Sequence, residues 1–272
     1  MTRILVILFV FFGLTSCSSK FAKVMKSSDN EYKYKMAEQY YALKKYEQAR
    51  QIYESLFPYV KGTSRFEDMY YKFAYTHYYQ EDYLNAENLF KTYTENFPNS
   101  PRAEECEYMR AYCFYLQSPK VDLDQTNTSK TIGLMQAFIN THPGSSRIKD
   151  ATVIIDASRK KLEQKEYKAA ELYYNLGFYR AAAIAFSNLM ENFPDTESSP
   201  EYKIKVIKAY YKYAEMSIPS KQAERFEKVL SEVSDFNERF PDSKLKGEAE
   251  NYKNLSNNFL KNLANEQVKK AA

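Results

Sequence analysis

The chain has 272 residues, of which 39 are lysine or arginine and 35 are aspartate or glutamate, so its formal net charge is only +4. A balance this even, without a concentrated basic stripe, argues against a nucleic-acid-binding protein. Six glycines, no tryptophan and an abundance of Lys, Glu, Ala, Leu and Tyr favour an all-α array over a sheet-based domain.

The N-terminal residues have the pattern of a bacterial lipoprotein signal. Arg3 precedes an unbroken apolar run at 4–12, which is too short to span a bilayer but has the length of a signal-peptide core. The Leu14-Thr15-Ser16-Cys17 that follows is similar to a lipobox, in which the cysteine is acylated and becomes the first mature residue. We therefore predict a signal peptide at 1–16, lipidation of Cys17 and a polar tether over 17–28. An ordinary secretory signal with a chance cysteine is the alternative.

The stretch 67–100 defines the repeating unit of the chain. It predicts a helix, a turn at Glu81-Asp82, a second helix and the terminator Phe97-Pro98-Asn99-Ser100. The small residues Ala74 and Ala86 lie twelve positions apart. That spacing is typical of a tetratricopeptide (TPR) unit, in which small residues let two antiparallel helices approach and a proline ends the second.

The same unit recurs on both sides of this stretch. Ala37 and Ala49 repeat the positions of Ala74 and Ala86 at a distance of 37 residues. The terminator recurs at 142–145, 193–196 and 240–243. Because one unit cannot bury its apolar face alone, we expect a TPR-like α-solenoid of about five helix pairs. Repeats 1–3 would occupy 29–146, and repeats 4 and 5 with a capping helix would occupy 147–272.

Local signals set the expected boundaries in the first half of the chain. Asp29 or Asn30 is suited to cap the first helix, and residues 58–64 read as a loop. Ser100 is suited to cap the first helix of the third pair, with Pro101 at its first helical position, where no N–H bond is lost.

Longer elements are expected in the second half. Residues 117–130 read as a polar insertion, and insertions of that length are often functional or disordered. One long helix over about 147–175 would extend the fourth repeat. In the fifth repeat, 200–241, two sets of residues compete for the inner face: Ile204, Ile207 and Tyr211, or Val206, Ala209 and Tyr213. The final helix, 243–268, is expected to pack through Leu245, Leu255, Phe259 and Leu263.

No catalytic constellation is apparent. The two histidines, His77 and His142, cannot build a typical zinc site without further ligands at fixed spacing. Cys106 and Cys113 would lie roughly 10 Å apart on one helix, too far for a disulfide, and are expected in the core. Phosphate-cradling glycine loops and nucleophile elbows do not occur. We expect no enzymatic activity, no cofactor and no metal site.

Tyrosines recur at matched positions of the first three repeats. In a TPR superhelix, such first-helix positions line the inner groove, where tyrosine offers contact area at low entropic cost. The pattern predicts a groove for an extended peptide with aromatic or apolar side chains. The alternative is that these rings pack together as ordinary core. The residues expected to line the groove are Tyr34, Tyr41, Tyr71, Tyr75, Tyr78, Tyr79, Tyr108, Tyr112 and Tyr115.

A lipobox followed by about five TPR-like units resembles the BamD (ComL-like) family, the lipoproteins of the β-barrel assembly machine. The resemblance rests on the lipobox, on Tyr108-Met109-Arg110-Ala111 and above all on the block 161–182 with its terminator Phe193-Pro194-Asp195-Thr196. It implies a scaffold anchored in the inner leaflet of the outer membrane and facing the periplasm. Ser18, where inner-membrane lipoproteins carry aspartate, agrees with that destination.

The resemblance also implies partners. The N-terminal repeats would receive the aromatic-ended C-terminal strands of unfolded outer-membrane proteins, and the C-terminal repeats would dock on the periplasmic domains of a BamA-like barrel. Two alternatives stay open: a TPR lipoprotein that organises cell-wall or division proteins, and a carbohydrate-importer lipoprotein, whose chains are typically much longer.

Overall fold

The computed structural model describes residues 20–271, with side chains up to residue 265. The predicted signal peptide and Cys17 lie outside the described residues. Within the described part, all regular secondary structure is helical. The chain forms two compact units, the first ending at Ser158 and the second beginning at Arg159. The division falls inside a long helix rather than after residue 146, where we expected it.

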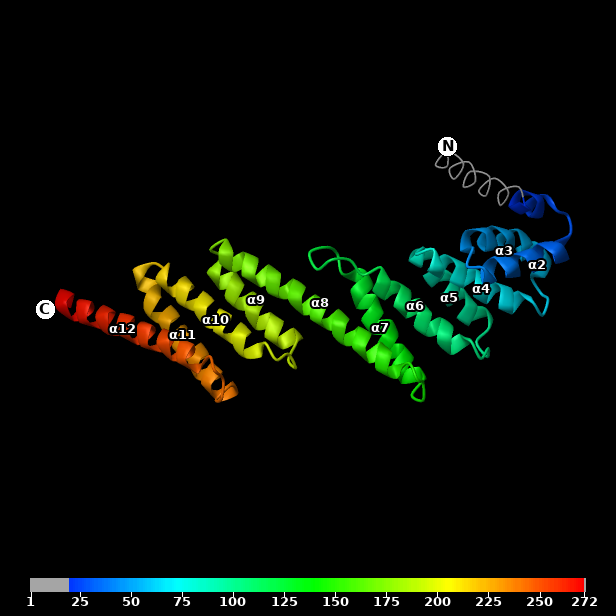
Figure 1. Ribbon diagram of the computed structural model, residues 1–272. Helices are drawn as coiled ribbons and strands as arrows, with labels where there is room; N and C mark the ends of the chain where they lie inside the picture. Colours follow the sequence, from blue (N-terminus) through cyan, green and yellow to red (C-terminus); the bar gives the residue numbers. More distant parts are fainter. Residues whose placement is uncertain (1–19, 272) are drawn as a thin grey trace, which may run out of the picture. The chain divides into compact units, whose positions relative to one another are not determined.

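The first unit stacks three helix pairs in which each helix packs on the next along the chain (Figure 1). Its pairs correspond to the three predicted N-terminal repeats. The helices are α2 (Asn30–Ala42), α3 (Tyr46–Val60), α4 (Phe66–Tyr79), α5 (Tyr83–Asn96), α6 (Ala103–Leu116) and α7 (Thr126–Thr141).

The long helix α8 (Ile148–Asn175) matches the extended helix predicted from the sequence. Its first turns place Ala151, Ile154 and Ile155 in the core of the first unit, whereas Ala170 belongs to the core of the second. The helices that follow are α9 (Tyr179–Asn192), α10 (Ser199–Glu215), α11 (Pro219–Arg239) and α12 (Lys246–Ala271).

The small residues that define the repeat are at the closest helix contacts, as predicted. Ala37, Ala49, Ala74 and Ala86 are all fully buried. Because alanine extends no further than Cβ, the paired helices approach closely, and larger side chains such as Phe90 fill the space between repeats. The TPR-like α-solenoid is therefore confirmed.

The turn inside a helix pair requires one left-handed residue. Lys44 has φ 56° and Glu81 has φ 60°, at positions 37 residues apart, and Gly177 has φ 80° in the fourth pair. Only glycine adopts this conformation without steric cost, so the first two turns each store some backbone strain.

The terminators connect successive repeats through their hydroxyl groups. Ser100 Oγ accepts from the backbone N–H of Arg102 at 3.1 Å and donates to Glu67 of α4 at 2.6 Å. Ser145 and Thr196 repeat both contacts, with Glu104 and Glu163 as acceptors. The expected capping of α6 by Ser100 was wrong, because the N-cap residue of α6 is Arg102, which makes no side-chain capping bond, and the backbone N–H that Ser100 bonds is that of Arg102, ahead of the helix. Placing Pro101 in the helix was wrong, because α6 begins two residues later, at Ala103.

Asp29 caps α2 as expected, since its Oδ1 accepts from the backbone N–H of Tyr32 at 3.0 Å. The polar tether before it was predicted incorrectly. Residues 20–26 form a short helix. Val24 is fully buried against the first repeat, and the ring of Phe21 lies 5.9 Å from that of Tyr40. Phe21, Val24 and Met25 hold this lysine-rich segment on the core of the first repeat.

The loop expected over 58–64 is shorter than predicted. Helix α3 continues through Pro58 to Val60, which is buried. A proline after the first turn of a helix removes one backbone hydrogen bond and crowds the carbonyl four residues earlier, and burial of Leu56 and Val60 on the core offsets that cost. Gly62 then makes the turn with φ 85°.

The polar insertion is also shorter than predicted and is ordered. Only residues 117–125 lie between α6 and α7. Gln125 is buried, and its amide nitrogen lies 2.9 Å and 3.1 Å from the carbonyl oxygens of Lys120 and Leu123. One side chain therefore holds the loop closed by bonding its backbone.

The aliphatic residues of both competing registers of the fifth repeat are buried, whereas Tyr211 and Tyr213 are only half-buried. Val206 and Ala209 pack in the core shared with α9, while Ile204 and Ile207 pack in the core shared with α11 and α12. Helix α10 is therefore covered on two faces.

The predicted packing seam of α12 was wrong at Leu255, which is exposed. The inward face instead carries Ala249, Tyr252 and Ser256, while Phe259 stacks on Phe226 of α11 with ring centroids 4.3 Å apart.

Candidate peptide-binding surface

In each of the first three repeats, the first of the predicted groove tyrosines lies beneath an arginine of the following repeat. The guanidinium carbons of Arg65, Arg102 and Arg147 lie 5.1, 4.5 and 4.7 Å from the ring centroids of Tyr34, Tyr71 and Tyr108, respectively. Such cation–π contacts are attractive and here tie neighbouring repeats together. These three tyrosines therefore serve the stacking of repeats.

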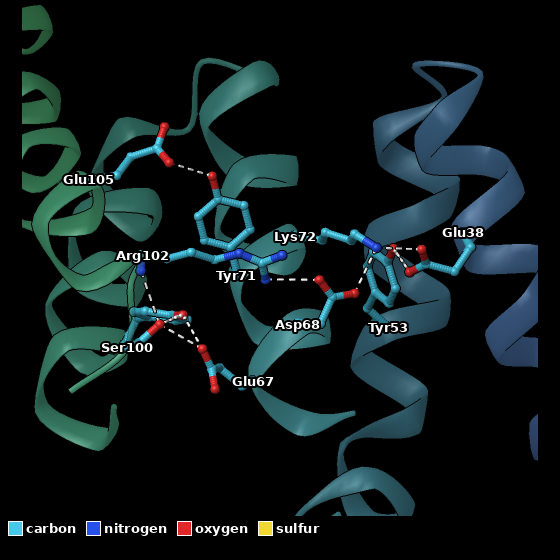
Figure 2. Close-up of polar contacts among 10 residues, drawn as sticks. Glu38, Tyr53, Glu67, Asp68, Tyr71, Lys72, Ser100, Arg102 and Glu105 are labelled. Atoms are coloured by element: carbon cyan, nitrogen blue, oxygen red, sulfur yellow. Dashed lines mark hydrogen bonds and ion pairs between the residues drawn. The ribbon is translucent and has the colours of Figure 1, made fainter. Parts of the chain in front are cut away.

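Carboxylates at matched positions complete these junctions. Asp68 pairs with Arg102 at 2.8 Å, and Glu105 pairs with Arg147 at 3.1 Å. Figure 2 shows the Asp68–Arg102 pair beside Tyr71, whose hydroxyl donates to Glu105 at 2.8 Å.

Glu105 also accepts a hydrogen bond from a second phenol, that of Tyr75, at 2.8 Å. Burial raises the pKa of both Tyr71 and Tyr75, so both hydroxyls remain protonated donors at neutral pH. One carboxylate of α6 thereby fixes two rings of α4 and one arginine.

Glu105→Ala should lower the free energy of unfolding by about 2 kcal/mol. It removes three charge-assisted hydrogen bonds, from Tyr71, Tyr75 and Arg147, and leaves the hydroxyl of the buried Tyr75 without this acceptor. Urea denaturation checks this, with Glu95→Ala as control, because within the described residues Glu95 makes a single, exposed ion pair, with Lys91 at 3.7 Å. A loss below about 0.5 kcal/mol for Glu105→Ala would contradict the assigned role.

A continuous chain of ring contacts crosses all three repeats of the first unit. It starts with Tyr41 against Tyr46 at 5.7 Å, and Tyr46 stacks on Tyr79 at 4.4 Å. Tyr79 contacts Tyr78 at 5.4 Å, and Tyr78 lies 6.4 Å from Tyr112 in the next repeat. Tyr112 in turn stacks on Tyr115 at 5.9 Å. We call these six residues the tyrosine cluster.

The tyrosine cluster lies where the helices of each pair turn. Tyr41, Tyr79 and Tyr115 stand near the C-terminal ends of α2, α4 and α6, and Tyr46 begins α3. Tyr79 is 47% exposed, and the other five members are partly buried. Their rings therefore form a surface that solvent reaches, and buried side chains pack beneath it.

Two of the predicted groove residues supply that support and offer no surface of their own. Tyr75 and Tyr108 are buried, and their rings contact Tyr79 and Tyr112. At these two positions the tyrosines pack in the hydrophobic core, which was the alternative to a peptide groove. Of the nine predicted tyrosines, the cluster retains Tyr41, Tyr78, Tyr79, Tyr112 and Tyr115.

Tyr46 was missed, and so was Tyr83, whose ring lies 5.8 Å from that of Tyr78. The signal was present, because these two residues are 37 positions apart, like the alanines of the repeat. We had searched only the first helix of each pair.

Exposed leucines extend the apolar character of this edge. Leu43 lies in the turn after α2, Leu84 in the first turn of α5 and Leu123 in the loop after α6, and all three are exposed. Burial raises the pKa of Tyr78 to about 12, so its hydroxyl is a neutral donor near this apolar surface. Apolar surface with interspersed hydroxyl groups is typical of sites that bind other proteins.

The remaining candidate groups have structural partners. His77 lies 2.7 Å from Asp82, and His142 lies 2.8 Å from Glu107. Within the described residues, no group of three or more His, Cys, Asp or Glu is arranged to hold a metal ion. Among the described helices, none has both the length and the hydropathy to cross a membrane.

Comparison with known families gives a match to YfiO, described as outer membrane lipoprotein, over residues 26–202. The chain belongs to the YfiO family. The matched residues include the whole tyrosine cluster and end within α10. Family membership places the protein among outer membrane lipoproteins. YfiO membership and the paired-helix fold together make it a helical-repeat scaffold of the kind that binds other proteins.

Among solved structures, the chain is similar to a TPR2AB-domain:pHSP90 complex of yeast Sti1, with 11% identity and a TM-score of 0.41. That likeness covers 84% of this chain and 96% of the other. No curated protein matches the chain.

Proposed function

We propose that this protein is the lipid-anchored scaffold of a β-barrel assembly complex in the outer membrane. In this role, Cys17 carries the anchor and the helices face the periplasm. The first unit receives C-terminal strands of unfolded outer-membrane proteins, and the second docks on the periplasmic domains of a BamA-like barrel. No step of this role makes or breaks a bond.

The tyrosine cluster is the observation that supports this proposal most directly. Six rings in unbroken contact over three repeats offer a row of stacking positions to an extended segment. An aromatic-rich strand matches such a row, because aromatic pairs contribute beyond their buried area. In a member of an outer membrane lipoprotein family, unfolded barrel proteins are a fitting source of such strands.

Purification of the tagged chain after mild detergent extraction should recover a large β-barrel protein in near-stoichiometric amount. The interaction is between folded domains, so it should survive detergent that replaces the lipid. A matched extraction of a Cys17→Ser variant reports whether the anchor is needed for assembly. Recovery without any barrel protein, or binding to cell-wall sacculi instead, would contradict the proposal.

A further inference from the structure

The second unit contains a cleft that the proposed peptide site does not involve. Helices α9 and α11 both pack on α10, and a cleft of about 540 Å³ opens between them. Tyr210 and Tyr213 of α10 line it, Arg180 comes from α9, and Arg225 and Lys228 come from α11. Apart from Arg180, these residues lie outside the part of the chain that matches the family.

The charge of the cleft is positive. Its lining includes the cations Arg180, Lys221, Arg225 and Lys228 and the anions Glu224 and Glu227, a difference of four minus two, or +2. Lys228 pairs with Glu232 at 2.6 Å, and Lys221 pairs with Glu224 at 3.0 Å.

Arg180 is exposed at the edge of the cleft, and within the described residues no carboxylate pairs with it. Arg225 is held in place by the chain itself: its guanidinium carbon lies 4.0 Å from the ring centroid of Tyr213, and it donates to Ser217. The two arginines thus present one free and one positioned guanidinium to a ligand. Guanidinium groups bind carboxylates through paired, charge-assisted hydrogen bonds.

Large apolar side chains surround the helix ends that form the cleft. Phe178 precedes α9 and is 60% exposed, while Met216 and Ile218 lie in the turn between α10 and α11 and are 75% and 66% exposed. Exposed apolar side chains close to a cleft in the sequence are a feature of surfaces that bind other proteins. They provide an apolar contact next to the cationic one.

We infer that the cleft binds an acidic segment of a partner protein that carries a bulky apolar residue beside its carboxylates. The carboxylate pairs with Arg180, the apolar side chain packs on Phe178, Met216 or Ile218, and the tyrosines form the floor. The volume agrees with a few side chains of a protein segment. The inference rests on the proposed docking role of the second unit and is independent of the peptide role of the tyrosine cluster.

The test is selection from a phage-displayed library of random peptides on the full-length protein. The protein used carries Tyr79→Ala and Tyr112→Ala, so that binders of the tyrosine cluster do not dominate the selection. We expect selected peptides to place Asp or Glu next to Leu, Ile, Phe or Trp. Arg180→Glu should weaken their binding at least about tenfold, since it replaces attraction by repulsion.

A matched control makes the same change of charge elsewhere on the unit. Lys244 is exposed and follows the C-terminal end of α11, which lies roughly 20 Å along the helix from Arg225 of the cleft. Lys244→Glu should leave affinity within about twofold. Selected peptides without acidic enrichment, or equal affinity for the Arg180→Glu protein, would overturn the inference. Binding of phosphatidylglycerol vesicles through Arg180, with no acidic peptide selected, would also overturn it. A negative result for the cleft would not affect the proposed peptide binding by the tyrosine cluster, which is tested by other variants.

Discussion

Lys203→Ala should lower the free energy of unfolding by about 3 kcal/mol. Lys203 is buried in α10, and its ammonium pairs with Glu232 and Asp235 of α11. Glu232 is buried as well, and although desolvation opposes its ionisation, hydrogen bonds from Lys203 and Lys228 hold its pKa below the usual value. Removing the lysine leaves a buried carboxylate with only its more exposed partner, Lys228.

Two further variants show whether the loss of stability in Lys203→Ala comes from the burial of the ion pair or from the loss of a charge alone. Lys205→Ala, two residues away, removes a more exposed pair with Glu171 at 3.1 Å and should cost less than about 1 kcal/mol. The double variant Lys203→Met/Glu232→Leu replaces the pair by apolar side chains of similar size and should regain most of the loss. Guanidinium denaturation measures all three. Equal effects of Lys203→Ala and Lys205→Ala would show that the buried pair has no special importance.

The buried Lys203–Glu232 pair could not be predicted from the sequence. Four lysines recur along α10, and such a run normally indicates a solvated face with, at most, an acidic contact. Instead each of them pairs with a carboxylate of its own chain, and Lys203 does so inside the core: Lys203 with Glu232, Lys205 with Glu171, Lys208 with Glu248 and Lys212 with Glu215. Pairing between helices depends on their crossing geometry, which no local pattern of residues encodes.

Elements with a strong local signal were predicted well. The alanine spacing located the paired helices, and the absence of glycine and proline located α8. Boundaries that depend on distant contacts were predicted less well. Val24 lies in a lysine-rich stretch and Val60 follows a proline, yet both are buried by residues far along the chain. Leu255 shows the reverse case, an apolar residue left outside by the angle at which α12 packs.

For the candidate site, the sequence pattern could not give the role of each tyrosine. Repetition of tyrosine located the rings that contact one another across the repeats, but it could not distinguish an exposed ring from a buried ring that supports it. Tyr71 satisfies the pattern as well as Tyr79 does, yet its ring lies beneath Arg102 and its hydroxyl bonds Glu105. That distinction arises from the arginines and carboxylates of the following repeat.

Replacing Tyr79 and Tyr112 together by alanine should weaken binding of an aromatic-rich, strand-forming peptide roughly 100-fold. The two residues flank Tyr78 in the tyrosine cluster, so their loss interrupts the row on both sides of its centre. Each removed ring takes away stacking area on which an extended peptide would rest. Fluorescence anisotropy with a labelled peptide ending in phenylalanine measures the change. The pair is preferable to any variant containing Tyr75, because that ring is buried and its loss would disturb the fold.

The control removes two tyrosines that are not part of the cluster. Tyr32 and Tyr59 are exposed, and neither ring contacts another aromatic ring within the described residues. Tyr32→Ala/Tyr59→Ala should therefore bind the peptide as the wild type does.

Thermal unfolding of both double variants tests whether the fold is retained. We expect that it is, because neither Tyr79 nor Tyr112 is fully buried. If Tyr79→Ala/Tyr112→Ala binds with unchanged affinity, the cluster is packing between repeats and not a peptide site. If it loses binding only together with its fold, the single variant Tyr79→Ala decides, since that ring is the most exposed of the cluster.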